Sequence, residues 1–436
     1  MSLKLKVPES KLPRIIIVGG GFAGLAMAKQ LYNAPYQVVL IDKNNYHTFQ
    51  PLLYQVASGA LEPDAIVAPF RLIFEKKKNI FFRMAEVIKI EAETNNLITS
   101  IGNIKYDYLV IASGSKTNYF GKKDVEEFCM PMKSVPNALD LRSLIIQNFE
   151  HAVNYDEGDE KESLIDIVVV GGGPTGVETA GALAELKKHV LPDDYQELDL
   201  SRMDIYLVEK SSQLLNGMSN EASSKTKQYL EKLGVNVWLN TGLESYDGNN
   251  AVFSNGKVIA TKGLIYSAGV IGNPIAGIKP ESITKGRIQV DEYLKLKDYE
   301  NIFAMGDVAA IQQNQKLPHP MVAQVAMQQG VYLGKRFLKN FKTGKPFQYK
   351  NLGAMATIGR NKAVADLPLL KLQGFVAWLV WIFIHLMHLV GYRNRVVVFM
   401  HWANSYFSSE KRFRLIIRPF NRVNTYTQKT TQQQEI

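Results

Sequence analysis

Residues 14–31 read RIIIVGGGFAGLAMAKQL, and residues 166–183 read DIVVVGGGPTGVETAGAL. Each stretch is a run of β-branched and other apolar residues, followed by a glycine triplet and then by small residues at helical spacing. A run that is apolar on both faces is typical of a strand buried in a parallel sheet. The chain therefore contains one strand–turn–helix unit twice, and this repeat decides the expected fold.

The glycines of both copies follow the G-x-G-x-x-G pattern. The first glycine allows a tight turn, the second lets a pyrophosphate approach the backbone, and the third lets helix and strand pack closely. The helix then offers free N–H groups and the positive end of its dipole to the phosphates. The glycines expected to bind two dinucleotides are Gly19, Gly21 and Gly24 in the first copy and Gly171, Gly173 and Gly176 in the second.

An acidic residue at the end of the following strand is a further mark of a dinucleotide site. In the first copy QVVLID ends at Asp42, 18 residues after Gly24, where a carboxylate can hold an adenosine ribose. In the second copy the candidate is Glu209 in DIYLVEK, 33 residues after Gly176. An insertion, HVLPDDYQELDLS (189–201), explains the longer spacing. Two chance glycine turns are a poor explanation for a strand, a fingerprint, a helix and an acid in both copies.

Two dinucleotide sites in one chain imply electron transfer between two cofactors, with FAD resident and NAD(P)H as the substrate. The stretch NIFAMGDVAA (301–310) is predicted to be a strand that ends at Gly306 and Asp307 before a helix. The carboxylate of Asp307 can hold the ribityl hydroxyls of a flavin. It can also be the N-cap of the expected helix, and the two roles are compatible.

Two further predicted strands, YDYLVIASGS (106–115) and KGLIYSAGV (262–270), end in small residues. Small residues at these points let the chain cross between domains beside the cofactors. The candidate cofactor-binding residues in these turns are Ser113, Gly114 and Gly269.

We therefore expect an α/β protein with two Rossmann-like domains, the NADH-binding domain being inserted into a discontinuous FAD-binding domain. The expected ranges are 1–120 and 300–350 for FAD, 121–299 for NADH, and 351–436 for a C-terminal membrane-anchoring region.

Composition limits the class of protein. With 436 residues the chain is too long for one core, and 46% hydrophobic and 21% charged residues exclude wholesale disorder. The net charge of +10 fits a nucleic acid, a membrane surface or an anionic ligand as partner. Cys129 is the single cysteine, so there is no C-x-x-C pair to act as the redox relay of a disulfide reductase.

The paired fingerprints, the Gly-Asp turn and the segment YHTFQPLLYQVASG (46–59) resemble those of type II NADH dehydrogenases. These are single-subunit NADH:quinone oxidoreductases of the respiratory chain that do not pump protons. The resemblance covers nearly the whole chain, including AQVAMQ (323–328) and GAMATIGRNKAVAD (353–366). It implies a flavoprotein with FAD bound, NADH as the substrate and a membrane quinone as the acceptor.

The resemblance also implies three residues of the catalytic site. Gln324 and Gln328 are four residues apart, hence on one face of a helix that begins near Pro320, and match glutamines that line the quinone pocket. Glu178 matches a glutamate close to the nicotinamide. From the residues alone, the glutamines fit a solvated face that also carries Gln329, and Glu178 fits a carboxylate stabilised by the helix dipole.

The C-terminal region carries a long apolar segment. Residues 374–392 read GFVAWLVWIFIHLMHLVGY, which as a helix is about 28 Å long and so permits a single crossing of a membrane. His385, His388 and two tryptophans in its interior favour the interface instead. The basic stretch 393–422 then faces anionic headgroups. We expect a monotopic protein on the cytoplasmic face of the cell membrane, a buried core helix being the third reading.

Other functions fit the same fold. One is a soluble FAD-dependent NAD(P)H reductase of a ferredoxin-like protein, and another is a dinucleotide-sensing flavoprotein that acts by binding a partner. We expect no nucleic-acid partner, and a homodimer is compatible with the sequence. No metal is expected, because the pair His385 and His388 lacks a third ligand nearby.

Overall fold

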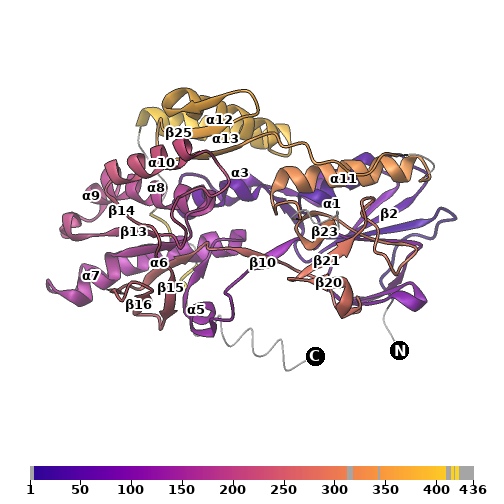
Figure 1. Ribbon diagram of the computed structural model, residues 1–436, viewed down its shortest axis with the longest axis horizontal. Coiled ribbons are helices and arrows are strands. Elements are labelled where there is room, and N and C mark those ends of the chain that lie inside the picture. The colour runs from indigo at the N-terminus through magenta and orange to yellow at the C-terminus, as the bar shows by residue number, and fades with distance from the viewer. Residues whose placement is uncertain (1–3, 312–317, 342–343, 409–413, 417, 422–436) are drawn as a thin grey trace. The chain divides into compact units, whose positions relative to one another are not determined.

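A computed structural model describes residues 4–311, 318–341, 344–408, 414–416 and 418–421 (Figure 1). The chain divides into two compact units, each built from three separate segments. Unit one contains Met1–Thr48, Val67–Lys116 and Val270–Asn351, and unit two contains Phe49–Ile66, Thr117–Gly269 and Leu352–Ile436.

A parallel five-stranded sheet forms the centre of unit one. Its strands β22 (Ile302–Ala304), β9 (Tyr108–Ile111), β1 (Arg14–Val18), β2 (Gln37–Asp42) and β5 (Ile80–Met84) follow one another in that order. β1 lies between β9 and β2, and its residues Ile15–Val18 are buried on both faces as expected from their apolar run. Fingerprint helix α1 (Phe22–Gln30) follows β1 directly.

A second helix, α11 (Ala323–Leu338), packs against α1 in unit one. Glycines make this close approach: a Cβ atom at Gly330 would lie 2.3 Å from the carbonyl oxygen of Ala23. The helix begins at Ala323, close to the start expected near Pro320. AQVAMQ is therefore the first part of a helix that is held against the fingerprint helix.

Shorter strands complete unit one. They are β3 (Tyr46–Thr48) with β4 (Val67–Pro69), the antiparallel set β6 (Val87–Glu91), β7 (Asn96–Thr99) and β8 (Gly102–Lys105), and the set β20 (Ile283–Thr284), β21 (Arg287–Val290) and β23 (Ala309–Ile311). The prediction of a helix directly after the Gly-Asp turn is wrong. A single 3-10 turn, η5 (Gly306–Val308), leads into β23, which pairs with β21. Strand pairing thus takes up the residues that were expected to be helical.

Unit two repeats the central arrangement with the second fingerprint. Its parallel sheet has the order β11 (Met130–Pro131), β18 (Gly263–Tyr266), β12 (Ile167–Val170), β13 (Ile205–Val208) and β14 (Val235–Trp238). β12 lies between β18 and β13, as β1 lies between β9 and β2. The predicted pair of Rossmann-like sheets is confirmed, because each copy of the repeat is a buried central strand.

Helices and a small sheet surround the sheet of unit two. The longer helices are α6 (Val135–Ala152), α8 (Pro174–His189) and α10 (Asn220–Lys232), and the shorter ones are α2 (Leu53–Ala57), α3 (Pro63–Ile66), α5 (Lys123–Phe128), α7 (Asp159–Ile165) and α9 (Leu191–Asp194). The strands β15 (Leu243–Tyr246), β16 (Asn250–Phe253) and β17 (Val258–Ala260) form the antiparallel sheet. Serine side chains cap α6 and α10, since Ser134 and Ser219 accept from backbone N–H groups in the first turn.

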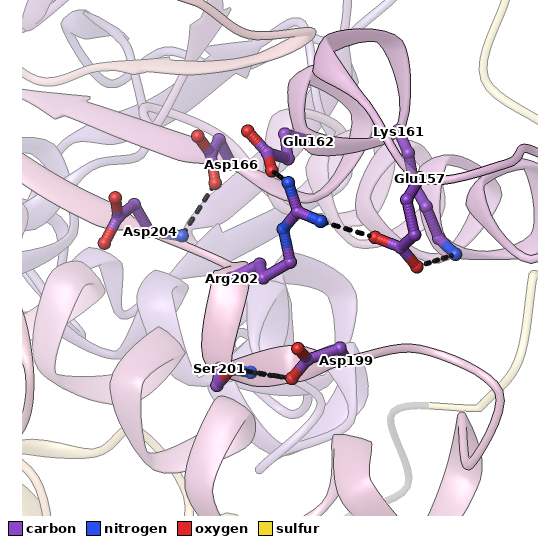
Figure 2. A network of polar contacts seen from close by, with 8 residues as sticks. All are labelled: Glu157, Lys161, Glu162, Asp166, Asp199, Ser201, Arg202 and Asp204. Carbon is purple, nitrogen blue, oxygen red and sulfur yellow. Dashed lines mark hydrogen bonds and ion pairs between the residues drawn. The ribbon is translucent and has the colours of Figure 1, made fainter.

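The polar stretch 154–163, which the sequence suggests as a linker, is tied to this sheet (Figure 2). Arg202 forms ion pairs with Glu157 and Glu162, and Lys161 lies 2.8 Å from Glu157. The carboxylate of Asp166, at the end of α7, accepts from the backbone N–H of Asp204 at 2.7 Å. Burial raises the pKa of Asp166 to about 7. The stretch therefore leads into a helix, and Asp166 after that helix anchors it at the N-terminal edge of the sheet.

The C-terminal part of unit two is a three-stranded sheet followed by two helices. The strands β24 (Ala354–Thr357), β25 (Ala363–Asp366) and β26 (Lys371–Gln373) are antiparallel, and α12 (Gly374–His388) packs on β25. The expected helix over 374–392 stops at His388, because Leu389 is extended and Gly391 has a φ of +90°. The chain then turns into α13 (Tyr392–Ser408).

The apolar segment is therefore shorter than its sequence suggests. Fifteen helical residues extend about 22 Å. Among the residues that the structure describes, no helix combines the length and the apolar character needed to cross a membrane. Ala377 and Trp381 of α12 are buried, whereas many of its other apolar side chains are exposed.

The two compact units differ from the expected domain ranges in two segments. The segment 270–299, expected in the NADH-binding domain, clusters with unit one, and Phe49–Ile66 clusters with unit two. Short-range packing explains both, because β21 pairs with β23 of unit one and α2 packs on α6 and α8 of unit two. The assignment of the ranges to FAD and NADH stays a prediction.

Candidate functional site

The three glycines of the first fingerprint have three different environments. Gly19 has a φ of +100°, and a Cβ atom there would lie 2.2 Å from the carbonyl oxygen of Ala112. A Cβ atom at Gly24 would lie 1.9 Å from the carbonyl oxygen of Gly19. At Gly21 a Cβ atom would meet nothing within 4 Å. The first and third glycines are thus required by packing, and the second borders open space.

The second fingerprint in unit two has the same division. Gly171 has a φ of +110°, and its Cβ atom would lie 2.7 Å from the backbone of Ser267. A Cβ atom at Gly176 would lie 1.8 Å from the carbonyl oxygen of Gly171, and at Gly173 it would meet nothing within 4 Å. Packing alone does not require Gly173, so its free space is what a pyrophosphate needs.

The helix that follows each fingerprint begins without a side-chain cap. Gly21 is the N-cap of α1 and Gly173 the N-cap of α8, and neither helix receives a side-chain hydrogen bond at its start. The first N–H groups of an uncapped helix need acceptors, and phosphate oxygens supply them. Open space at the second glycine and an uncapped helix start together fit FAD in one unit and NADH in the other.

The two acidic residues brace these loops in the same way. Asp42 accepts from the backbone N–H of Gly20 at 2.6 Å and of Asn44 at 2.8 Å. Glu209 accepts from the backbone N–H of Gly172 at 2.5 Å and of Ser211 at 2.7 Å. Each carboxylate is therefore held beside the glycine triplet, where the ribose of a bound dinucleotide is expected.

The Gly-Asp turn of unit one is held by side chains from two directions. The hydroxyl of Ser115 donates to the carboxylate of Asp307 at 2.6 Å, and the backbone N–H of Gly306 donates to the amide oxygen of Gln329 at 2.6 Å. Gly306 has a φ of +76°. The carboxylate of Asp307 thus has a defined orientation, and it is not the N-cap of the 3-10 turn, whose N-cap is Met305.

Gln329 is buried. The solvated face that the residues alone would also fit does not include it, because only 1% of Gln329 is exposed and its amide orders the Gly-Asp turn. Its position four residues after Val325 and three after Ala326, both buried, is the signal that could have placed it on the buried face.

The two crossover turns differ in their surroundings. The hydroxyl of Ser113 donates to the carbonyl oxygen of Asn273 at 2.7 Å, and Gly114 has a φ of +71° with nothing within 4 Å of its Cβ position. Both lie in unit one. Gly269, in unit two, has a φ of +151°, and a Cβ atom there would lie 3.5 Å from the ring of Phe120.

His47 is a further residue beside the first fingerprint that sequence reasoning missed. Its Nδ1 lies 2.9 Å from the carbonyl oxygen of Gly20, and its ring meets Phe22 edge to face. Burial lowers the pKa of His47 to about 4, so the ring is neutral. Its Nε2 is buried and has no partner among the described residues. An unpaired buried nitrogen at this loop also fits a polar ligand such as FAD.

The two candidate glutamines of the quinone pocket lie on α11 in unit one. Both are half-buried. The amide of Gln328 makes two hydrogen bonds with the backbone of Lys350, donating at 2.8 Å and accepting at 3.0 Å. Gln328 therefore also anchors the segment that follows the helix. The pocket role of Gln324 and Gln328 stays a prediction.

Glu178 lies in unit two, in the interior of α8. The backbone N–H of Thr357 on β24 approaches its carboxyl group at 3.4 Å. Burial raises the pKa of Glu178 to about 8, and Thr357 and the indole of Trp381 oppose this shift. Burial is therefore the main influence on the pKa of this carboxyl group and outweighs the groups that stabilise its charge. At neutral pH Glu178 is a buried, protonated carboxyl group.

A polar chain from two other elements lies beside Glu178. On α2, the amide nitrogen of Gln55 donates to the hydroxyl of Tyr54 at 2.8 Å. On α13, the indole N–H of Trp402 donates to the amide oxygen of Gln55 at 2.8 Å. Burial raises the pKa of Tyr54, and the charge of Glu178 raises it further. Tyr54 is thus close enough to Glu178 for the charge of that carboxyl group to affect its ionisation.

Comparison with known proteins connects these features. Residues 13–330 match the family model of pyridine nucleotide-disulphide oxidoreductases, and residues 351–410 match the NDH2 C-terminal domain. The type II NADH:quinone oxidoreductase Ndh of Mycobacterium tuberculosis is 33% identical over 91% of this chain and 89% of its own length. The chain belongs to the type II NADH dehydrogenase family.

Other members of the type II NADH dehydrogenase family are similar over the same range. The mitochondrial internal alternative NAD(P)H-ubiquinone oxidoreductase A1 of Solanum tuberosum is 31% identical over 90% of this chain and 86% of its own length. The structure of NDH2 from Plasmodium falciparum in complex with NADH has a TM-score of 0.85 at 23% identity. It covers 94% of this chain, and all of that chain is matched. The predicted fold, with its C-terminal helical region, is thereby confirmed.

Family membership separates this protein from a disulfide reductase of the same fold. Cys129 is buried and is the single cysteine of the sequence, so no cysteine pair exists to relay electrons. Within the described residues, no group of three or more metal-binding side chains is present.

Proposed function

We propose that this enzyme oxidises NADH and reduces a membrane quinone to quinol through FAD, in two half-reactions and without proton pumping. The observation that carries the proposal is the pair of equivalent loops, each with open space at its second glycine, in a chain whose residues 351–410 match the NDH2 C-terminal domain. FAD, when bound, would supply the redox chemistry that connects a hydride donor with a quinone acceptor.

The first fingerprint is assigned to FAD and the second to NADH. Unit one contains Gly21, Asp42 and the oriented carboxylate of Asp307, which suits a resident flavin with ribityl hydroxyls. Unit two contains Gly173 and Glu209, which suit NADH as the dinucleotide of the second loop. Positioning is the main contribution of both loops, because hydride transfer needs alignment and no acid or base.

Quinone is assigned to a pocket that involves Gln324 and Gln328, with Glu178 acting in catalysis. Quinone reduction consumes protons as well as electrons, and Glu178 is a carboxyl group that holds a proton at neutral pH. Buried groups with a strongly shifted pKa are concentrated at functional sites.

We assign membrane attachment to an exposed apolar face on the two C-terminal helices. The side chains on α12 recur every four residues, so they share one side of the helix. Large exposed apolar patches mark membrane or partner surfaces. The apolar face consists of Phe375, Leu379, Phe383 and Met387 on α12 and of Tyr392, Val396, Phe399 and Met400 on α13. This arrangement supports a monotopic protein whose helices lie in the membrane surface, and we place it on the cytoplasmic face.

Turnover with different acceptors tests the proposed function. The purified enzyme should oxidise NADH steadily with a soluble quinone and much more slowly with a ferredoxin-like protein. Stopped-flow measurement should resolve flavin reduction by NADH and flavin reoxidation by quinone as separate phases. Faster turnover with the protein acceptor would favour the reductase alternative, and binding of NADH without turnover would favour a sensing protein.

A further inference from the structure

The C-terminal helix α13 contributes one polar group to the buried interior of unit two. The indole of Trp402 reaches the amide of Gln55, and its ring lies 5.6 Å from the ring of buried Trp381. Gln55 and Tyr54 are themselves 8% and 7% exposed. A hydrogen bond from the tail therefore ends next to the pair formed by Tyr54 and Glu178.

The direction of this chain of hydrogen bonds follows from the chemistry of its first member. An indole N–H can only donate, so the amide of Gln55 must present its oxygen to Trp402. The amide nitrogen of Gln55 then faces Tyr54 and donates to its hydroxyl. A phenol oxygen that accepts from an amide keeps its own proton for another acceptor. The hydroxyl of Tyr54 is thus prevented from donating back to Gln55.

We propose that Trp402 is a positioning residue of the quinone half-reaction, which through Gln55 fixes the direction in which the hydroxyl of Tyr54 donates beside Glu178. The inference rests on the proposed function. The overall reaction, NADH + H⁺ + quinone → NAD⁺ + quinol, takes up one proton per turnover. Without the indole N–H, the amide of Gln55 can rotate so that its oxygen faces Tyr54. The hydroxyl of Tyr54 can then donate its hydrogen bond to that oxygen.

Besides Tyr54, whose pKa the charge of Glu178 raises, groups from two further elements lie at Glu178. From β24 the contact is a backbone N–H of Thr357, and from α12 it is the indole of Trp381. His385, one turn further along α12, bonds through Nδ1 to the carbonyl oxygen of Trp381. Burial lowers the pKa of His385 to about 4, so this ring carries no charge near neutral pH.

The variant Trp402→Phe tests the proposal, because it keeps an aromatic ring and removes the N–H together with part of the indole ring. Flavin reoxidation by a soluble quinone should slow about five- to tenfold, the effect of one buried hydrogen bond. Flavin reduction by NADH and the KM for quinone should stay unchanged. Trp378→Phe is the matched control, since Trp378 lies on α12 and makes ring contacts with Phe375 and Tyr406.

A double-mutant cycle separates positioning from packing. In a Tyr54→Phe background, Trp402→Phe should have no further effect on flavin reoxidation, because the hydroxyl it orients is gone. Gln55→Met should reproduce the effect of Trp402→Phe, which keeps the proposal testable if the tryptophan variant does not fold. Multiplicative effects of Trp402→Phe and Tyr54→Phe, or equal slowing of both half-reactions, would overturn the inference.

The same measurements distinguish the inference from the function on which it rests. If the unmodified enzyme does not reoxidise its flavin with quinone, the proposed function fails. If it does so and Trp402→Phe behaves like Trp378→Phe, the function stands and the role of Trp402 is wrong.

Discussion

At the scale of single residues, the carboxyl groups of this enzyme behave according to their surroundings rather than their sequence neighbours. Asp42 and Glu209 are fixed by backbone N–H groups of the glycine loops, whereas Glu178 is buried and the backbone N–H of Thr357 lies 3.4 Å from its carboxyl group. The first two are suited to binding hydroxyl groups. The third is suited to holding a proton.

Glu209 should give a preference for NADH over NADPH. Its carboxylate is held beside the second fingerprint, where it would repel a ribose 2′-phosphate. Glu209→Gln keeps the size and an acceptor oxygen but removes the charge. The ratio of kcat/KM for NADH to that for NADPH should fall about tenfold or more, while the FAD content stays unchanged. An unchanged ratio would contradict the role of Glu209.

Glu178 should make the folded state less stable as the pH rises. Its pKa is raised in the folded state to about 8 from an ordinary value of 4.5, so the folded state holds the proton more tightly. The resulting loss in the free energy of unfolding is absent below pH 4.5. It grows by up to about 1.4 kcal/mol per pH unit and levels off above pH 8. The apparent Tm of Glu178→Gln relative to the unmodified protein should therefore increase from pH 5 to pH 8. A difference that is constant with pH would show that Glu178 is not buried as a neutral acid.

At the scale of elements, the strand–turn–helix unit occurs twice with the same division of labour among its glycines. Third glycines allow helix and strand to touch, and second glycines leave space. One pair of substitutions in unit two separates these roles, and FAD bound in unit one serves as an internal reference.

Gly173→Ala and Gly176→Ala should differ in what they damage. The Cβ atom of Gly173→Ala meets no protein atom, so thermal stability should be unchanged while KM for NADH rises about tenfold through crowding of the pyrophosphate. In Gly176→Ala the Cβ atom would lie 1.8 Å from a carbonyl oxygen, so apparent Tm should fall by several degrees. Gly173→Ala with an unchanged KM for NADH would argue against a pyrophosphate at this loop.

At the scale of the whole molecule, attachment to a membrane depends on how the C-terminal residues are used. The basic residues expected to face lipid headgroups have partners within unit two: Arg393 lies 3.7 Å from Asp64, Arg414 lies 2.6 Å from Asp194, and Arg418 pairs with Asp140. Lys411, Arg412 and Arg422 lie outside the described residues. The apolar face therefore carries most of the expected attraction.

Charges placed on the apolar face should release the enzyme from lipid. Leu379 and Phe383 are 47% and 63% exposed, and replacing both by aspartate should weaken binding to liposomes about a hundredfold. Flotation on a density gradient measures this. Val258→Asp is the control, because Val258 on β17 is 59% exposed and lies outside the apolar face. Loss of liposome binding in the control as well would indicate a general charge effect.

High salt should release little of the membrane-bound enzyme, whereas detergent should extract it. At 1 M salt the Debye length is about 3 Å, so attraction between exposed charges is screened. Salt does not weaken the burial of apolar side chains. Sedimentation of membranes after each wash measures the fraction retained. Complete release by salt alone would show that the two helices are not embedded.

The sequence by itself determined the features that depend on local pattern. Apolar runs next to glycine triplets specify a buried strand, a tight turn and an uncapped helix, and these are local requirements of backbone space. The fold, both fingerprints and the acids Asp42 and Glu209 could therefore be predicted from spacing along the chain. The length of the apolar tail helix could not, because its end depends on a turn at Leu389 and Gly391.

Only the tertiary structure decided which polar side chains act together. Gln329 orders the Gly-Asp turn from a helix that begins 16 residues after Asp307, and Gln55 joins Tyr54 to Trp402, 347 residues away. Burial of Glu178 likewise comes from β24 and α12, which lie far along the chain. A side chain's pKa and its hydrogen-bond partners depend on what packs against it in space, and no periodicity along the sequence encodes those neighbours.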